Sequence, residues 1–142
     1  MIIRRVTSDD YMDIYNINKE SLGYDYSEDK TKMQLEKIMQ LQSNIIFVAQ
    51  QENHVIGYIH LSEYENTYHD SLKNIVTFAV AKNYQNHGVG EKLITAAEEW
   101  AKESGSRGIR LVTGHERKAA RKFYAKHGYE LRKEQSNLIK WF

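Results

Sequence analysis

The chain has 142 residues, a net charge of +1 and no cysteine. Its length fits one domain, and without cysteine the chain cannot form disulfides, thiolate metal sites or a cysteine nucleophile. The opening residues are too charged for a signal peptide, and no apolar run approaches the roughly 18 residues of a membrane span. We therefore expect a cytoplasmic protein that binds no membrane.

The charges are unevenly distributed along the chain. Residues 1–80 carry a net charge of −5, and residues 81–142 carry a net charge of +6. We therefore expect an anionic ligand to bind the second part, whereas the first part favours a cationic ligand.

One strand and two helices are predicted first. Residues 2–6 are typical of a short strand, and the segment from Thr7 to Asp10 has the capping-box spacing that starts a helix. Apolar residues then recur at helical spacing as far as Leu22. After a break at residues 23–27 we predict a second helix, which ends at about Gln42.

Three strands are predicted next, over residues 45–50, 55–61 and 74–80. A turn at Glu52 and Asn53 makes the first two strands a hairpin. The third strand is apolar on both faces apart from Thr77, which is typical of a strand in the centre of a sheet.

The rest of the chain alternates between helices and strands. The predicted elements are a helix, a strand, a helix and two short strands, over residues 88–104, 109–113, 117–127, 129–133 and 138–142. Because the first of these helices joins two strands, residues 74–113 should form a parallel crossover. The predicted fold is α/β with the order βααβββαβαββ, a mixed and mostly antiparallel central sheet flanked by helices, in a single domain over residues 1–142.

Two glycines stand at the start of the helix that begins near residue 88. Gly88 and Gly90 leave backbone N–H groups unshielded where the helix dipole is positive, which suits a phosphate. The same spacing also serves tight turns, so both interpretations stay open on spacing alone. A dinucleotide fingerprint needs a third glycine where Leu93 stands, and the Gly-Lys-Ser/Thr of a Walker loop is absent.

The residues around this loop resemble the GCN5-related N-acetyltransferases, the GNAT family. The family's Gln/Arg-x-x-Gly-x-Gly/Ala loop corresponds to Gln85 through Gly90, after the predicted central strand. A second family motif, Ala-x-x-Phe/Leu-Tyr-x-x-x-Gly-Phe/Tyr, corresponds to Ala120 through Tyr129. Both motifs occur in order on the expected elements, and the element order matches the acyl-CoA N-acyltransferase fold, so the resemblance covers essentially the whole chain.

The resemblance implies an enzyme that transfers the acetyl group of acetyl-CoA to a primary amine by direct attack in a ternary complex. It implies that loop amides hold the pyrophosphate, that the pantetheine arm pairs with the central strand, and that the Val80 N–H polarises the thioester carbonyl. Tyr124 matches the tyrosine that protonates the leaving thiolate. The implied cofactor-binding residues are Phe78, Ala79, Val80, Gln85, Asn86, His87, Gly88, Val89 and Gly90.

The chain departs from the family pattern at two points. Arg117 stands where many members have a pantetheine-binding Asn, although a subset has Arg, so we treat Arg117 as a candidate cofactor contact. The predicted central strand contains no acid, so no general base follows from a motif. Candidates by position are Glu63, Glu65, His60, His69 or a water chain. Histidines 60 and 69 lack a recognisable ligand spacing, and we expect no metal.

The acceptor is expected between the first two helices and the strand at residues 55–61. Aromatic and acidic residues there favour a cationic amine such as a polyamine, an aminoglycoside or a peptide amine; they are Tyr24, Tyr26, Glu63, Tyr64 and Tyr68. The first alternative is a non-catalytic acyl-CoA-binding sensor of the same fold. A nucleic-acid binder is the second, and the near-neutral total charge argues against it. Family members are often dimers, so a homodimer is a further expectation.

Overall fold

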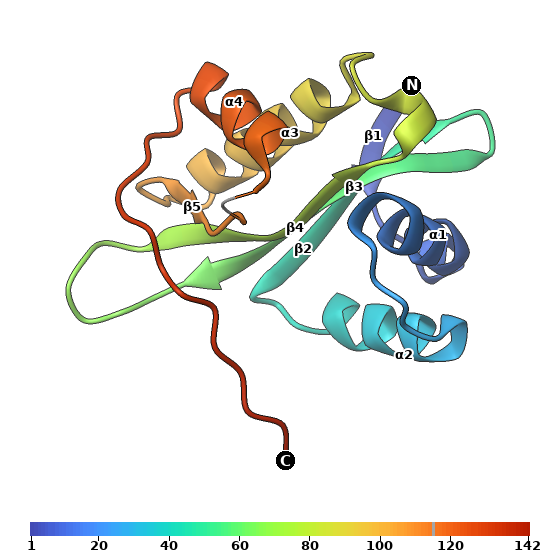
Figure 1. Ribbon diagram of the computed structural model, residues 1–142, viewed down its shortest axis with the longest axis horizontal. Coiled ribbons are helices and arrows are strands. Elements are labelled where there is room, and N and C mark those ends of the chain that lie inside the picture. The colour runs from blue at the N-terminus through green and yellow to red at the C-terminus, as the bar shows by residue number, and fades with distance from the viewer. Residues whose placement is uncertain (115) are drawn as a thin grey trace. The chain divides into compact units, whose positions relative to one another are not determined.

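The computed structural model describes residues 1–114 and 116–142 (Figure 1). The chain divides into two compact units, Met1–Leu111 and Val112–Phe142, and each is described by itself. That residues 1–142 form one domain stays a prediction.

The first unit is built on a five-stranded sheet in the order β1-β2-β3-β4-β5. Its strands are β1 Ile2–Arg5, β2 Asn44–Gln51, β3 His54–Tyr64, β4 Leu72–Val80 and β5 Ile109–Leu111. The first four pair antiparallel in sequence order, and β5 joins β4 in parallel. The mixed, mostly antiparallel sheet, its hairpin and its parallel crossover are therefore as predicted.

Helices cover both faces of this sheet (Figure 1). Helix α1 Tyr11–Leu22 and helix α2 Glu28–Met39 lie on one face, and α3 Val89–Glu103 lies on the other. A short 3₁₀ turn, η1 Ser8–Asp10, precedes α1, and the predicted capping box is present there. The hydroxyl of Ser27 accepts a hydrogen bond from the Lys30 N–H at 3.0 Å and caps α2.

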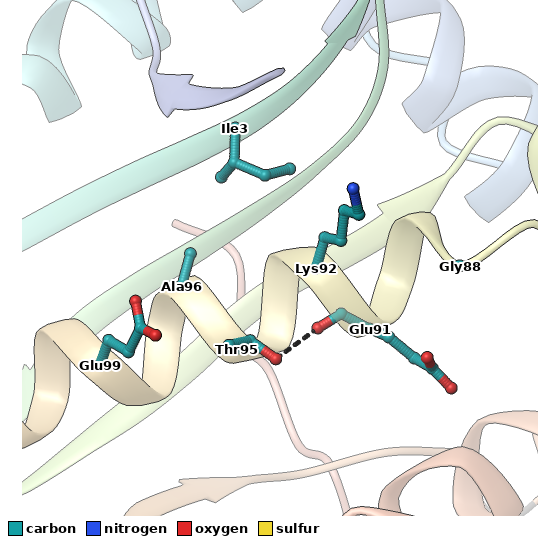
Figure 2. Close-up of a pocket in the computed structure, with 7 residues that line it drawn as sticks. All are labelled: Ile3, Gly88, Glu91, Lys92, Thr95, Ala96 and Glu99. Carbon is teal, nitrogen blue, oxygen red and sulfur yellow. Dashed lines mark hydrogen bonds between the residues drawn. The ribbon is translucent and has the colours of Figure 1, made fainter. Parts of the chain in front are cut away.

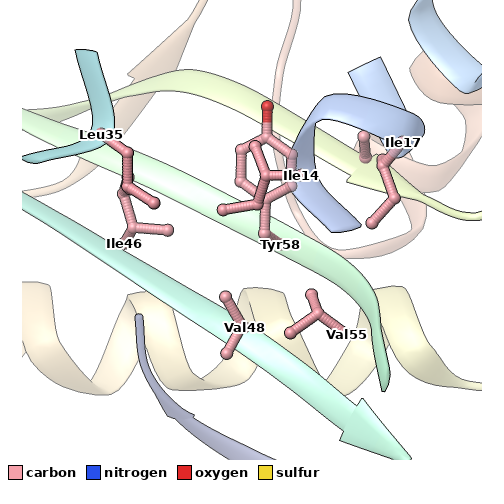
Figure 3. Packing of buried hydrophobic residues seen from close by; sticks show 8 residues of the cluster. Ile14, Ile17, Leu35, Ile46, Val48, Val55 and Tyr58 are labelled. Atoms are coloured by element: carbon pink, nitrogen blue, oxygen red, sulfur yellow. The ribbon is translucent and has the colours of Figure 1, made fainter. Parts of the chain in front are cut away.

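The core on the α1 and α2 face is made of branched aliphatic side chains and one tyrosine. Figure 3 shows Tyr58 of β3 beneath α1, with Ile14 beside its ring. The cluster joins both helices to three strands and consists of Ile14, Ile17, Leu35, Ile46, Val48, Val55, Tyr58 and Ala79. On the opposite face α3 buries Leu93, Ile94 and Ala97 completely. Burial of these apolar surfaces is the main force that fixes the helices on the sheet.

Gly57 in β3 lets the first turns of α3 pack closely on the sheet. A Cβ at Gly57 would lie 3.1 Å from Val89 Cγ1, 3.2 Å from Leu93 Cδ1 and 3.1 Å from the Ala79 carbonyl oxygen. A side chain at this position would require these neighbours to move by a few tenths of an ångström, because the site is closely packed. Gly57 therefore sets the height of the start of α3 above β4.

A partly buried ion pair connects β1 to the start of α1. Both terminal nitrogens of Arg4 lie 2.8 Å from the Asp10 carboxylate, and the Thr7 N–H donates to the same carboxylate at 2.8 Å. Burial alone would raise the pKa of Asp10, but the hydrogen bonds from Arg4 and Thr7 outweigh it and hold the pKa below its ordinary value. The bidentate geometry is the one that stabilises a partly buried pair best.

Strand β4 is bonded very differently along its two edges. It pairs with β3 along its whole length but with β5 only through Lys73, Asn74 and Ile75. The register between β3 and β4 shifts between His60 and Leu61, which places one extra residue, Val76, in β4. Such a bulge bends a strand, and β4 leaves β5 at this point.

The second unit contains one helix, α4 Lys118–Lys126, followed by Gly128 with a φ of 88°. The two strands predicted over residues 129–133 and 138–142 are wrong, because neither segment is a strand in the structure. A strand requires a hydrogen-bonded neighbour, and α4 is the one regular element described in Val112–Phe142.

Smaller differences concern the ends of elements. The second helix ends at Met39 rather than near Gln42, because the chain turns back through a bond from the Asn44 N–H to the Leu41 carbonyl. The strand predicted over residues 109–113 ends at Leu111. Among the described residues, none of the helices combines the length and the apolar character that crossing a membrane requires.

Candidate active site

The loop between β4 and α3 has an unusual backbone. After a 3₁₀ turn, η2 Lys82–Tyr84, Asn86 and Gly88 both have positive φ angles, 66° and 81°. A Cβ at Gly88 would meet nothing within 4 Å, so it is the left-handed conformation and not crowding that calls for glycine there. Alternating left-handed residues turn successive N–H groups toward one side and make an anion-binding concavity.

The start of α3 leaves its backbone donors available. Gly88 is the N-cap, and no described side chain caps this end. The N–H groups of the first turn have no partner within a helix, and here they include those of Val89 and Gly90. Val89 is only 3 % exposed, so its side chain belongs to the core and only its backbone can reach a ligand. Of the other predicted loop residues, Gln85, Asn86 and His87 are exposed.

The end of β4 that β5 does not pair lies beside this loop. The Ala81 N–H donates to the Ile56 carbonyl on β3 at 2.8 Å. Hydrogen-bonded and non-bonded pairs alternate in an antiparallel ladder. The N–H of Val80, the residue before Ala81, therefore points away from β3. The same alternation directs the N–H of Phe78 to that edge. The predicted residues Phe78, Ala79 and Val80 thus form the part of β4 that β5 does not pair.

Tyr124 lies in the second unit, on α4. Its ring is in edge contact with those of Phe123 and Tyr129, with centroids 5.7 and 5.5 Å apart. Burial raises the pKa of Tyr124 to about 12, although the nearby positive charge of Arg117 acts in the opposite direction. The hydroxyl therefore keeps its proton at neutral pH. Arg117 itself is the N-cap residue of α4.

Three of the four side chains that we considered as bases are held by other partners. The Glu63 carboxylate lies 3.6 Å from the Lys73 ammonium, which sits over the Trp100 ring of α3 and hence on the α3 face. The Glu65 carboxylate accepts a hydrogen bond from the Ser71 hydroxyl at 3.0 Å. In His69, Nδ1 bonds the Asp70 carbonyl at 2.7 Å and Nε2 bonds the Asn66 amide at 2.6 Å.

His60 is the fourth candidate and has a different environment. It is 8 % exposed on β3, and its Nε2 lies 2.7 Å from Asn44 Oδ1, so Nε2 carries the proton. Among described residues, no hydrogen bond reaches Nδ1. Burial lowers the pKa of His60 to about 4, which keeps the ring neutral at physiological pH.

Several polar groups of β3, β4 and α1 that lie near Val80 or Thr77 of β4 were not predicted as site residues. The Tyr58 hydroxyl hydrogen-bonds Asn18 of α1 and Thr77 of β4, and burial raises the pKa of Tyr58 to about 12. Ser21 of α1 donates to the Val80 carbonyl at 3.1 Å. No spacing signal could have found these pairs, because Ser21 and Val80 are 59 residues apart in the sequence.

A shallow, open depression of about 490 Å³ lies between α3 and Ile3 of β1 (Figure 2). Along α3 it extends from Gly88 past Lys92 to Glu99. Since β1 is the edge strand farthest from β4 in the sheet order, this depression lies away from the Phe78–Val80 edge. It shares only the start of α3 with the predicted site.

Comparison with known proteins gives a consistent result. The model of the Acetyltransferase (GNAT) family matches residues 11–129. Streptothricin acetyltransferase A of Bacillus subtilis is 40 % identical over 83 residues, which are 58 % of this chain and 46 % of that protein. An uncharacterized N-acetyltransferase of Methanocaldococcus jannaschii is 28 % identical over 135 residues, 90 % of this chain and 60 % of that protein. The chain thus spans about half of the length of these curated relatives.

The fold is shared with solved structures at lower identity. AAC(6')-Iy in complex with the bisubstrate analog CoA-S-monomethyl-acetylneamine superposes with a TM-score of 0.85 at 21 % identity, over 99 % of this chain and 98 % of that chain. This similarity confirms the predicted fold class.

The buried imidazole gives a prediction about stability. Because the pKa of His60 is lowered on folding, the unfolded chain binds more protons between pH 6.5 and pH 4, and stability must fall as the pH decreases through this range. We expect His60 to account for a loss on the order of 2 kcal/mol in the free energy of unfolding between pH 7 and pH 4.5. Urea unfolding of wild type and His60→Gln at both pH values measures it. The exposed His87→Gln is the control, and equal pH dependence in all three proteins would contradict the prediction.

Proposed function

The chain belongs to the Acetyltransferase (GNAT) family, and from this premise we propose that it moves the acetyl group of acetyl-CoA to a primary amine. The amine nitrogen attacks the thioester carbon in a ternary complex, the C–N bond forms, and the C–S bond breaks to release CoA. The observation that carries the proposal is the uncapped start of α3 beside an edge of β4 that β5 leaves unpaired.

The loop residues Gln85 to Gly90 are proposed to hold the pyrophosphate of acetyl-CoA. Positive φ angles at Asn86 and Gly88 and the backbone amides of Val89 and Gly90 at the start of α3 suit two adjacent phosphates. Gln85 contributes differently from its neighbours, because its side-chain amide donates to the Val80 carbonyl at 3.1 Å. We propose Arg117 as a further cofactor contact on the family motif alone.

The β4 edge is proposed to bind the acyl arm. The pantetheine amides would pair with Phe78, Ala79 and Val80 as an added strand does. The Val80 N–H, which β3 does not use, would then donate to the thioester oxygen as negative charge develops on it. A donor that is fixed before the reaction needs no reorganisation and lowers the barrier accordingly.

Proton transfers are proposed to use Tyr124 and water. A tyrosine hydroxyl that stays protonated at neutral pH can donate to the departing thiolate, whose solution pKa is about 8.5. The substrate ammonium must first lose a proton from a group with a pKa of about 10. Among the side chains considered, His60 alone has a free ring nitrogen, but its pKa of about 4 makes it a weak base. We therefore assign the ammonium proton to a water chain.

The acceptor is proposed to carry additional positive charge. Tyr24 and Tyr26, between α1 and α2, are 61 % and 47 % exposed, and the acids Asp25, Glu28 and Asp29 beside them are also exposed. Exposed aromatic faces and carboxylates together attract cations. Two residues of the predicted acceptor region do not contribute, since Glu63 pairs with Lys73 and the Tyr64 ring faces the Arg110 guanidinium at 4.5 Å.

Binding of acetyl-CoA tests the loop. We expect wild type at 100 times the dissociation constant to gain about 2.7 kcal/mol of stability, visible as a higher unfolding midpoint. Gly88→Trp should lose this shift, because an indole would cover the loop amides. Gly105→Trp is the matched control, since Gly105 has a similar φ of 77° and equally open space but lies beyond the other end of α3. Binding that survives in Gly88→Trp would overturn the loop assignment.

Turnover separates the enzyme from a non-catalytic acyl-CoA sensor. Tyr124→Phe removes only the hydroxyl, so we expect unchanged acetyl-CoA affinity and a kcat that falls by about a hundredfold. Tyr15→Phe on α1 serves as the control and should keep its activity. If wild type binds acetyl-CoA but acetylates no amine, the sensor is the better proposal. An unchanged kcat in Tyr124→Phe would remove Tyr124 from the mechanism.

A panel of amines tests the acceptor class. We expect a polyamine or an aminoglycoside to have a higher kcat/KM than a monoamine with no other charge. Asp25→Asn should raise the KM of the polycation about threefold, as expected for one exposed charge pair, and leave the monoamine unchanged. The measurement is steady-state kinetics at low ionic strength, where exposed charges act most strongly. Better turnover of the monoamine would contradict a cationic acceptor.

A further inference from the structure

Ser21, in the last turn of α1, makes a hydrogen bond of a different kind from those of Thr95 and Ser104. The hydroxyls of Thr95 and Ser104 bond the carbonyl four residues earlier, at 2.8 and 2.7 Å. This local bond is the usual one for a hydroxyl within a helix. The Ser21 hydroxyl instead crosses to β4 and donates to the Val80 carbonyl at 3.1 Å.

The peptide group between Val80 and Ala81 is held from three directions. Its carbonyl accepts from Ser21 of α1 and from the Gln85 side chain of the loop, each at 3.1 Å. Its N–H donates to the Ile56 carbonyl of β3 at 2.8 Å. We call these three bonds the Val80 clamp. They join the first helix, the loop and the sheet at one point.

The clamp lies in the part of β4 that β5 does not pair. In a central strand both edges are fixed by neighbours, but β5 pairs with β4 only as far as Ile75. Beyond Ile75, β3 is the one strand that fixes the orientation of the outward-facing Val80 N–H. Hydrogen bonds from side chains can fix this orientation further. Ser21 supplies one such bond from an element outside the loop and the sheet.

We propose that Ser21 is a positioning residue, which orients the Val80 N–H toward the thioester carbonyl by holding the Val80 carbonyl. This inference rests on the proposed acetyl transfer. Ser21 acts through Val80 and needs no contact with acetyl-CoA. Loss of its hydroxyl should therefore disturb the geometry of the reacting carbonyl more than the affinity for the cofactor.

The first measurement needs no cofactor. In the free protein we expect Ser21→Ala to accelerate hydrogen exchange of the Ala81 N–H about fivefold, because loss of one hydrogen bond loosens the clamp. Ser104→Ala is the matched control and should leave the exchange of Ala81 unchanged. Ser21→Thr keeps a hydroxyl and should restore slow exchange. If Ser21→Ala does not fold, Ser21→Cys keeps the volume with a weaker donor and takes its place.

The second measurement is made with acetyl-CoA labelled with ¹³C at the carbonyl. We expect Ser21→Ala to bind it within about threefold of wild type, to lower kcat about tenfold, and to move the bound carbonyl resonance toward that of free acetyl-CoA. Ser21→Thr should recover both quantities. A general loss of stability would not shift the resonance of the bound acetyl-CoA. It would also not lower kcat tenfold while the affinity stays within threefold of wild type.

Each result decides the inference. Unchanged Ala81 exchange in Ser21→Ala overturns the clamp, and faster exchange with unchanged kcat and resonance overturns the positioning role. If wild type binds no acetyl-CoA, the proposed function fails and the positioning role falls with it. Exchange at Ala81 then still shows whether Ser21 holds β4.

Discussion

The structure depends on the unequal bonding of β4. One edge of this strand is paired with β3 over its full length, and the other is paired with β5 only up to Ile75. The extra residue Val76 makes the two strands part, because a bulge bends the strand that contains it. A stretch of strand that one neighbouring strand leaves exposed can take an added strand along that edge. The acyl arm of the cofactor is proposed to pair in that way.

Several other contacts keep this unpaired stretch in place. Gly57 lets Val89 and Leu93 approach the sheet closely, so the start of α3 lies against Gly57 of β3, the residue that pairs with Val80 at the end of β4. The bond between the Ala81 N–H and Ile56 fixes the same end of β4 from the β3 side. The amides of the loop and those of the strand therefore have a fixed relation, which a ligand with both a pyrophosphate and an amide chain requires.

Much of the fold was predictable because it follows from local patterns. The helical periodicity from Val89 onward, the capping box at Thr7 and the hairpin between β2 and β3 were all visible in the sequence and are present. The prediction of two C-terminal strands was wrong, because the periodicity of a sequence does not show whether a neighbouring strand is present. Alternating residues form a strand only when a neighbouring strand pairs with them, and no strand of the described sheet pairs with residues 129–133 or 138–142. The same limit applies to the candidates for the general base. Sequence position alone did not show that Glu63 pairs with Lys73 on the α3 face of the sheet.

The sequence by itself determined the family and predicted the loop from Gln85 to Gly90 and Tyr124 as site residues, because each motif is a set of residues within a few positions of one another. The tertiary structure decided what joins them. The bond from Ser21 to Val80 links residues 59 positions apart, and the pKa of His60 depends on burial among side chains from other elements. Neither has a local signature, since both arise only when packing of apolar faces brings distant segments of the chain together.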